Sequence, residues 1–407
     1  MILLTQLAVR NLLRNWRRTL FTVCTLAIGV TLSIWTDNIT KQRAEDIVQN
    51  VTSAYVGHFQ ISTEAFRKDE QIQDYMDPEK ISTFSNMSPR IHFQGLLSSG
   101  ESSLPIVLDG IRPSSENLVT HLSKRIINGE YLSEETGPDC KEREILISEE
   151  QATKLHVGLG EKVVIVGAAS DGTLGNDLFR VKGVYKTESK NFDRRLSFAN
   201  FNCVAAMGQI GGPHELVFGL PDGIDESDFE ASLKTANKGT GYVLTSWRES
   251  VPQLNSIVIF SKAINNAINF ILFLVISIGI VNIMMMTVFE RTREFGVMSA
   301  LGASSKQVIS VVMIETISLG ILGLIVGSIF GSLLVQYHHI FGFDLSIFLG
   351  NQYSAGDFSL SMLVFPNLSL ASILRSGFIT LGFMLLAGFY PALRAARLTP
   401  IEAMRSL

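Results

Sequence analysis

Residues 263–289 read AINNAINFILFLVISIGIVNIMMMTVF, a run of 27 residues that contains no Asp, Glu, Lys or Arg. A helix needs about 20 apolar residues to cross the hydrocarbon core of a bilayer, which is about 30 Å thick. The run is therefore long enough to span a membrane with some tilt. It predicts a transmembrane helix, and hence a membrane protein.

Three further segments are long, apolar and nearly free of charge: residues 19–36, 308–340 and 374–393. A signal peptide is an alternative for the first of them. Its apolar run is longer than the usual length of about 7–15 residues, however, and no small-residue cleavage site follows before Lys41. We therefore predict four transmembrane helices. Glu315, in the third, is expected to face protein or the lipid headgroups, because a buried carboxylate in lipid is costly.

Lys and Arg residues close to the predicted spans indicate the orientation of the chain. They gather before the first span, between the second and third, and after the fourth: Arg10, Arg14, Arg17, Arg18, Arg291, Arg293, Lys306, Arg394, Arg397 and Arg405. Because cytoplasmic loops carry such an excess, both termini and residues 290–307 are predicted to be cytoplasmic. Residues 41–262 and 344–375 then face outward. Leucines at helical spacing in residues 2–18 predict an amphipathic helix at the cytoplasmic interface.

Residues 41–262 have the mixed composition of a globular domain. Short alternating runs predict strands, and periodic stretches predict helices. The predicted strands are residues 56–62, 104–108, 144–147, 162–166 and 179–185, and the predicted helices are residues 116–127 and 149–155. Because they interleave irregularly, we predict an α+β extracytoplasmic domain between transmembrane helices 1 and 2, with residues 1–40 before it and 263–407 after it. The Gly-rich residues 167–175 are expected to form a hairpin loop.

The three cysteines leave the redox state of this domain open. Cys24 lies in an apolar run, whereas Cys140 and Cys203 both fall in the outer domain. They are able to pair in an oxidising compartment only if their Cα atoms approach within about 7 Å, which spacing along the chain does not reveal. Two free, partly buried thiols are the favoured interpretation, and a disulfide is the alternative.

The sequence contains little that indicates catalysis. Its net charge is −4, which does not favour nucleic acid as a partner. It has no Gly-x-x-x-x-Gly-Lys-Ser/Thr loop for nucleotide phosphates, no metal-ligand spacing and no nucleophile in a recognisable context. We predict a non-catalytic chain with no metal and no cofactor of its own.

The segment between the second and third spans, residues 290–303, predicts a short charged helix. Phe295, Met298 and Leu301 are spaced by three and place one apolar strip on it. Gly302 is expected to end this helix with a positive φ, and Ser304 or Ser305 to cap the third span. An apolar ridge on a charged helix suits a groove on a cytoplasmic partner. The alternative is that its charges only set the membrane orientation.

Small residues recur every four positions in the third span, at Gly323, Gly327 and Gly331, with Gly320 nearby. In lipid, such a face permits close approach of another helix. The partner is expected to be the second or fourth span of the same chain, or a second subunit.

Several motifs, in their order along the chain, resemble the MacB/LolC/LolE/FtsX permease family of ABC transporters. They are LAVRNLLRN at residues 7–15, GHFQI at 57–61, GEYL at 129–132, EILIS at 144–148, VGLGEKV at 157–163 and FRVKGV at 179–184. The segment FERTREFGVMSALGASS at 289–305 is similar to the coupling helix of that family, and YPALRAARLTPIEAMR at 390–405 is similar to its ending. The GHFQI strand favours the lipoprotein-releasing branch.

The resemblance implies that residues 290–302 dock on a cytoplasmic ABC ATPase dimer, which binds the ATP and Mg. Glu290, Arg291, Arg293 and Glu294 would make polar contacts, Phe295, Met298 and Leu301 would fill a groove, and Gly296 and Gly302 belong to the same motif. A second ATPase contact is expected from Arg397, Pro400, Glu402 and Arg405 in the tail, where Pro391 and Pro400 are expected to break the helix.

The function implied by the resemblance is mechanotransmission in a bacterial inner-membrane permease that pairs with an identical or homologous subunit. Closure of the ATPase would move the outer domains, which would release lipoproteins from the membrane to a periplasmic carrier. An efflux permease for amphiphilic small molecules or peptides, or an FtsX-like regulator of a cell-wall hydrolase, remains an alternative.

Overall fold

The computed structural model describes Arg14 and residues 16–77, 87–100, 102–134, 140, 143–187, 189–221, 223–349, 354–355, 358–359 and 362–397. The chain divides into two compact units. The first comprises Met1–Glu45, Val258–Asn351 and Ser361–Leu407, and the second comprises Asp46–Ile257 and Gln352–Leu360.

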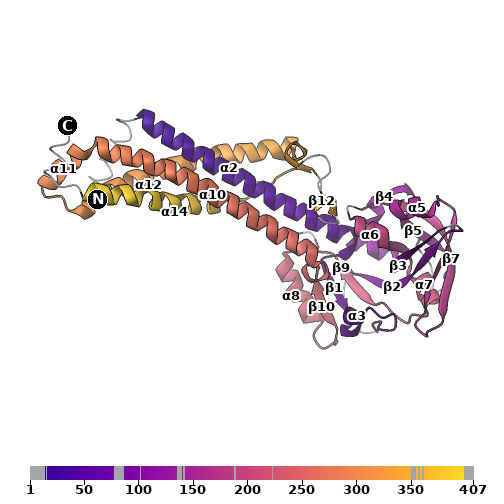
Figure 1. The fold of residues 1–407 in the computed structure, drawn as a ribbon. Helices are drawn as coiled ribbons and strands as arrows, with labels where there is room; N and C mark the ends of the chain where they lie inside the picture. Colours follow the sequence, from indigo (N-terminus) through magenta and orange to yellow (C-terminus); the bar gives the residue numbers. More distant parts are fainter. Residues whose placement is uncertain are drawn as a thin grey trace. The chain divides into compact units, whose positions relative to one another are not determined.

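Four helices in the described part of the chain are long and apolar enough to cross a membrane. They are α2 (Trp16–Val51), α10 (Pro252–Glu290), α12 (Ser305–Phe341) and α14 (Leu370–Ala396), and they run alongside one another in Figure 1. The four predicted spans are confirmed, and each helix extends beyond the apolar run that predicted it. A short helix, α11 (Thr292–Ala300), connects α10 to α12. After α12, α13 (Ser346–Leu349) and the pairs β11 (Phe343–Asp344) with β14 (Leu363–Val364) and β12 (Ser354–Ala355) with β13 (Phe358–Ser359) complete the connection to α14.

The glycine face of α12 packs against α2, within one chain. A Cβ atom at Gly323 would lie 2.5 Å from Cβ of Leu26, and one at Gly331 would lie 3.2 Å from Cβ of Ile34. Between them, Gly327 faces Val30, and its carbonyl accepts a hydrogen bond of 3.1 Å from Thr31 Oγ1. Our prediction named the second or fourth span or a second subunit, and for these three glycines it was wrong. Only Gly320 meets the fourth span, where Met384 lies 3.2 Å away.

The second unit is built on one large mixed sheet, which confirms the α+β prediction. The strand order is β10-β1-β9-β2-β3-β8-β5-β7-β4, and β6 pairs with both β2 and β7. The strands are β1 (Phe59–Ser62), β2 (Met87–Ser98), β3 (Ser103–Ile111), β4 (Ile126–Gly129), β5 (Glu144–Ser148), β6 (Lys162–Ala168), β7 (Leu174–Tyr185), β8 (Leu196–Asn200), β9 (Glu215–Phe218) and β10 (Val243–Ser246). The helices are α3 (Glu64–Asp69), α4 (Pro113–Val119), α5 (Glu149–Leu155), α6 (Lys190–Arg195), α7 (Phe201–Gly208), α8 (Glu226–Ala236) and α9 (Trp247–Ser250).

Each of the five predicted strands is present, and the helix predicted at residues 149–155 is α5. The Gly-rich stretch joins β6 to β7, with Gly167 opposite Gly175, as expected for a hairpin. The prediction of one helix over residues 116–127 was wrong. There, α4 stops at Val119, a 3-10 turn covers Leu122–Arg125, and Ile126 begins β4. Thr120, with φ −117 and ψ 150, ends α4, and pairing of Ile126 with Tyr185 overrides helix propensity.

Cys140 and Cys203 form a disulfide, with their Cα atoms 4.7 Å apart. The favoured interpretation of two free thiols was therefore wrong. The two residues are 63 positions apart in sequence, and Cys203 lies on α7 in the main core of the second unit. Their approach depends on how α7 packs on the sheet, which their spacing does not encode.

Candidate functional site

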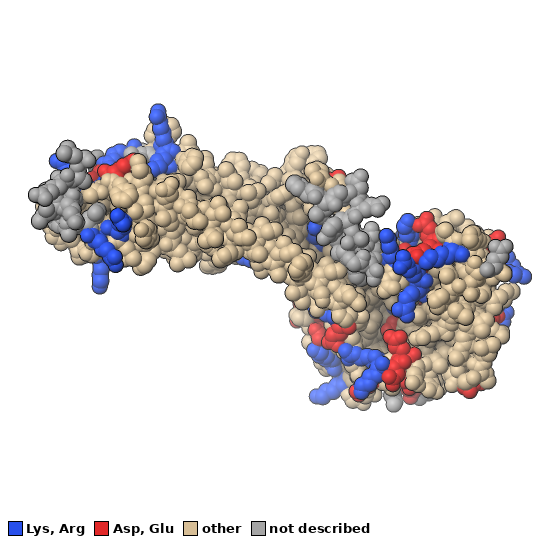
Figure 2. All heavy atoms as spheres, in the orientation of Figure 1, with Lys and Arg blue, Asp and Glu red and all other residues tan. Residues whose placement is uncertain are grey.

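The predicted charged helix between the second and third spans is α11, at one end of the bundle. On the face seen in Figure 2, charged side chains gather at this end and are sparse along the middle of the bundle. Arg291 interrupts the helix with φ −105 and ψ 13, and Gly302 follows α11 with φ +95, as expected for a glycine terminator. Ser304 caps α12, and its backbone N–H donates to Gln307 Oε1 at 2.7 Å. The prediction placed this helix at residues 290–303, and α11 covers Thr292–Ala300.

Arg291 is buried inside the chain and is not available to a partner. Its Nη1 lies 2.8 Å from Glu315 Oε2 on α12, and its Nε lies 2.7 Å from Glu294 Oε2. The side chains of Arg291 and Glu315 are 8% and 5% exposed. The expectation that Arg291 contacts an ATPase is therefore wrong, because the acid of the third span requires a buried cation. This pair fastens the start of α11 to α12, and it gives Glu315 a structural role.

Phe295 also points into the protein, contrary to the prediction that it fills a partner's groove. It is 1% exposed and packs with apolar residues of the spans: Leu26, Ile280, Met284, Val288, Val308, Val312, Leu319, Met384, Ala387, Ala392 and Ala395. Met298 packs partly against the same cluster, and Gly296 is buried. Of the predicted apolar strip, Phe295 and Met298 therefore anchor α11 to the bundle.

The outward face of α11 is formed by residues spaced by four. Val297 and Leu301 are 47% and 84% exposed, and Arg293 is exposed one turn earlier. We call these three residues the outward strip. Among the predicted site residues, Leu301 and Arg293 belong to it, whereas Val297 was missed. Arg293, Val297 and Leu301 are spaced by four along the chain, whereas the predicted strip joined Leu301 to Phe295 and Met298, which face inward.

Two ion pairs join α11 and the end of α10 to the segment that begins the first span. Arg14 Nη2 lies 2.6 Å from Glu294 Oε1, and Arg18 Nη1 lies 2.6 Å from Glu290 Oε2. Burial raises the pKa of Glu294, but its hydrogen bonds with Arg291 and Arg14 outweigh burial, and the pKa falls below its ordinary value. These pairs place Glu290 and Glu294 in contacts within the chain, where the prediction expected contacts with a partner.

The predicted tail contact is described only in part. Arg397 follows α14 as its C-cap residue, whereas Pro400, Glu402 and Arg405 lie outside the described residues. Pro391 does not break the helix, since α14 continues through it to Ala396. Neighbouring helices make a proline tolerable inside a span, and Pro391 is buried among them. Ser305 Oγ donates to the carbonyl of Ala396 at 3.4 Å, so the end of α14 lies beside the start of α12.

The second unit contains a largely buried group of charged side chains that sequence reasoning missed. Arg90, on β2, is 0% exposed, and its Nη2 lies 2.6 Å from Glu116 Oε1 on α4. Its Nη1 lies 3.4 Å from Glu215 Oε1 on β9. Burial lowers the pKa of Arg90, but the charge of Glu116 more than offsets it, and the pKa is raised. Arg90 alternates with the apolar Ile91 and Phe93 along β2, so the pattern predicts an exposed polar position, and nothing in the sequence marks Arg90 as buried.

His92 continues this group. Its Nδ1 lies 2.6 Å from Asp109 Oδ1, and its Nε2 lies 3.1 Å from Glu215 Oε1. Burial lowers the pKa of His92, but the two carboxylates outweigh burial and raise it to about 10, so His92 is protonated at neutral pH. His214 differs, because burial lowers its pKa to about 4 and its Nδ1 accepts the backbone N–H of His92 at 3.0 Å.

The buried group holds the turn in which the first long helix ends. A π-helical turn, Thr52–Val56, follows α2, and Gly57 closes it with φ +69. Arg90 Nη2 donates to the carbonyl of Tyr55 at 2.5 Å, and its guanidinium lies 4.5 Å from the centre of the Tyr55 ring. Arg90 therefore connects the end of α2 to the central strands of the sheet. We call Arg90, His92, Asp109, Glu116 and Glu215 the buried charge cluster.

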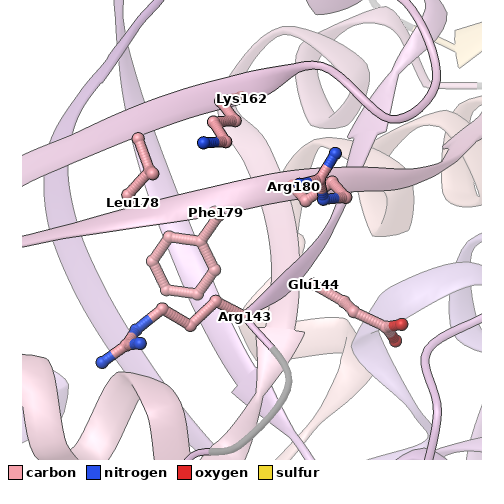
Figure 3. A pocket seen from close by; sticks show the side chains of 6 residues that line it. All are labelled: Arg143, Glu144, Lys162, Leu178, Phe179 and Arg180. Atoms are coloured by element: carbon pink, nitrogen blue, oxygen red, sulfur yellow. The ribbon is translucent and has the colours of Figure 1, made fainter.

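Two open hollows lie along strands β5, β6 and β7, with volumes of about 310 and 370 Å³. The first is lined by the residues shown in Figure 3: Arg143, Glu144, Lys162, Leu178, Phe179 and Arg180. The second shares Glu144 and Arg180 and adds Lys182 and Leu159. Basic and apolar side chains are mixed here, and the lining residues include no nucleophile with an adjacent base.

Comparisons with known proteins cover both units. The MacB-like periplasmic core domain matches residues 19–236, and the FtsX-like permease C-terminal domain matches residues 266–400. The chain is 25% identical over 332 residues to the lipoprotein-releasing system transmembrane protein LolC of Xylella fastidiosa strain Temecula1, a match that covers 78% of this chain and 77% of that protein. It is 35% identical over 144 residues to the macrolide export ATP-binding/permease protein MacB of Nitrobacter winogradskyi, which covers 35% of this chain and 19% of that protein.

A solved structure of the extracellular domain of YknZ, a noncanonic ABC-type transporter from Gram-positive bacteria, matches at 15% identity with a TM-score of 0.34. The match covers 46% of this chain and 99% of that one. The two domain matches together cover most of the chain and place an outer domain before a permease domain, in the order that the structure shows. This chain therefore belongs to the MacB/LolC/FtsX family and is an ABC transporter permease with an extracytoplasmic domain between its first and second transmembrane helices.

Proposed function

We propose that this permease works by mechanotransmission and releases lipoproteins from the bacterial inner membrane, using ATP hydrolysed by a separate chain. The observation that carries the proposal is the similarity to LolC, which extends over 78% of this chain. The continuity of α2 supports mechanotransmission. Helix α2 begins in the first unit and runs without interruption into the second, where the buried charge cluster holds the turn at its end.

In this proposal, α11 receives motion from a cytoplasmic ABC ATPase dimer. Its outward strip is the surface free to enter a groove, since Phe295 and Arg291 are occupied inside the chain. Motion of α11 would reach α12 through the Arg291–Glu315 pair and the first span through Arg14 and Arg18. A second permease subunit, identical or homologous, would match the two ATPase chains. ATP and Mg would be bound by the partner.

Replacing Leu301 with glutamate tests this docking. The side chain is 84% exposed, so the change should leave folding intact, whereas a carboxylate in an apolar groove is unfavourable. We expect copurification of the native ATPase to fall at least about tenfold, which corresponds to a loss of about 1.4 kcal/mol of binding free energy. Leu118→Glu, at an exposed leucine of the outer domain, is the matched control. Equal recovery of the ATPase with both variants would contradict the proposal.

The proposed orientation places the outer domain in the periplasm and both termini, with α11, in the cytoplasm. In a Cys24→Ser background, a cysteine at Glu150 should react with an impermeant maleimide in intact spheroplasts. One at Ser305 should react only after the membrane is opened. Ser305 is exposed and Glu150 is partly exposed, so both positions are open to the reagent on their own side of the membrane. Labelling of Ser305→Cys in intact spheroplasts would reverse the orientation.

An efflux permease for amphiphilic small molecules or peptides is the second candidate, and the similarity to a macrolide export protein favours it. The match covers 35% of this chain, which is why we place it second. Spheroplasts depleted of the permease separate the two candidates. Lipoprotein retained in the inner membrane supports the first function, and an unchanged lipoprotein distribution with increased macrolide sensitivity supports the second.

A further inference from the structure

A hollow of about 280 Å³ lies where the chain enters the first span, and it is lined by Arg14, Trp16, Arg17, Arg18 and Glu290. Three of these five residues are arginines, and they fall within five consecutive positions. An indole, which favours the headgroup level of a membrane, completes the lining. We call this hollow the arginine hollow.

The arginine hollow carries unneutralised positive charge. Arg14 and Arg18 each place one nitrogen 2.6 Å from an acid, Glu294 and Glu290 respectively. A guanidinium has five N–H donors, so a single such contact leaves others for a further acceptor. Among the described residues, Arg17 pairs with no acid, and its guanidinium lies 5.7 Å from the centre of the Trp16 ring. Three cations therefore face two carboxylates here, which leaves one positive charge.

An apolar surface adjoins the hollow on α2. Leu20 and Phe21, about one turn further along the helix, are 53% and 65% exposed, and Trp16 is 60% exposed. In a membrane, the exposed side chains of Leu20 and Phe21 would lie deeper in the bilayer than the guanidinium groups of the hollow. A ligand that fits both parts has an anionic head and an acyl chain. Inorganic phosphate would satisfy only the guanidinium groups.

We propose that the arginine hollow binds the phosphate of an anionic glycerophospholipid from the leaflet that α11 faces. Arg17 supplies the uncompensated charge, Arg14 and Arg18 donate hydrogen bonds that their ion pairs leave free, and the acyl chains lie along Leu20 and Phe21. Because Arg14 and Arg18 also hold Glu294 and Glu290, the bound lipid is in direct contact with the residues that connect the first span to α11. The site does not depend on which cargo the permease moves.

Native mass spectrometry of the full-length protein in detergent tests the site, with dioleoyl phosphatidylglycerol and dioleoyl phosphatidylcholine as the two probes. The wild-type protein should retain the anionic lipid in preference to the zwitterionic one. One Arg near a membrane surface contributes about 1 kcal/mol to anionic-lipid binding, so Arg17→Ala should reduce this preference roughly fivefold. Lys306→Ala removes an exposed cation at the same end of the bundle, outside the hollow, and should leave the preference unchanged.

Two results would overturn the proposal. The first is equal retention of phosphatidylglycerol by Arg17→Ala and the wild-type protein, or an equal loss in Lys306→Ala, because general surface charge would then account for binding. The second is displacement of phosphatidylglycerol by inorganic phosphate at equal concentration, because the site would then take a free anion and no lipid. Neither result depends on an ATPase or a cargo, so failure here is distinguishable from failure of the proposed transport function.

Discussion

Replacing Arg90 with methionine is expected to lower the free energy of unfolding of the outer domain by about 3–5 kcal/mol. Methionine fills much of the same volume but leaves Glu116 buried without its cation, and it leaves Glu215 with His92 alone. It also removes the donor to the carbonyl of Tyr55. Removing one partner of a buried ion pair costs far more than the pair contributes, because the remaining charge stays desolvated.

Denaturant unfolding of the full-length protein, followed by the fluorescence of Trp247, measures this change. Trp247 is buried in the second unit, and replacing Trp16 and Trp35 with phenylalanine removes the other two indoles. Arg67→Met is the matched control, since its 2.7 Å contact with Glu249 is exposed and such pairs contribute little. If Arg67→Met lowered the free energy of unfolding as much as Arg90→Met, burial of the ion pair would not explain the effect.

Under the proposed transport function, Arg90→Met should also reduce the coupling of ATP hydrolysis to cargo release. Because its contact with Tyr55 holds the turn that ends α2, Arg90→Met should weaken the connection between the first span and the sheet. Protein that remains folded should then hydrolyse ATP with its partner but release less cargo per ATP. A fall in both activities by the same factor would indicate only a loss of folded protein.

Replacing Gly327 with leucine is expected to separate α12 from α2. A Cβ atom there would lie 2.7 Å from Cβ of Val30 and 2.8 Å from the carbonyl oxygen of Ala27, and backbone atoms cannot move aside as a side chain does. Overpacking of this kind typically costs about 1–3 kcal/mol, and a close helix contact in lipid depends on small residues. The melting temperature of the purified protein in detergent should fall clearly.

Gly279→Leu is the control for this change. Gly279 lies on α10, and a Cβ atom there meets nothing within 4 Å. Both substitutions gain the same helix propensity, roughly 1 kcal/mol, so the difference between them isolates the packing contact. If the two variants melt at the same temperature, the glycine face of α12 is not a tight intramolecular contact, and pairing with a second subunit becomes the better explanation.

The distinction between the two faces of α11 shows where sequence reasoning stopped. The short helix, its glycine terminator and the cap of α12 were all predicted, because each depends on residues within a few positions of one another. Which apolar residues face inward was not. Phe295 faces inward because side chains of α2, α10, α12 and α14 form an apolar recess that takes its ring. Although α10 and α12 flank α11 in the sequence, Leu26 and Met384 complete the recess from positions far along the chain.

Sequence patterns alone predict the four membrane spans and five of the ten strands in the large sheet of the outer domain. These depend on long uncharged runs and on local alternation, because the bilayer excludes charge and a sheet separates its two faces. Four contacts follow only from the tertiary structure. Gly327 packs against α2, and Arg291 neutralises Glu315. Cys140 bonds to Cys203, and Arg90 is buried among carboxylates. Each of these is a contact between residues far apart in the chain, and its energy depends on distance and burial that only the folded chain defines.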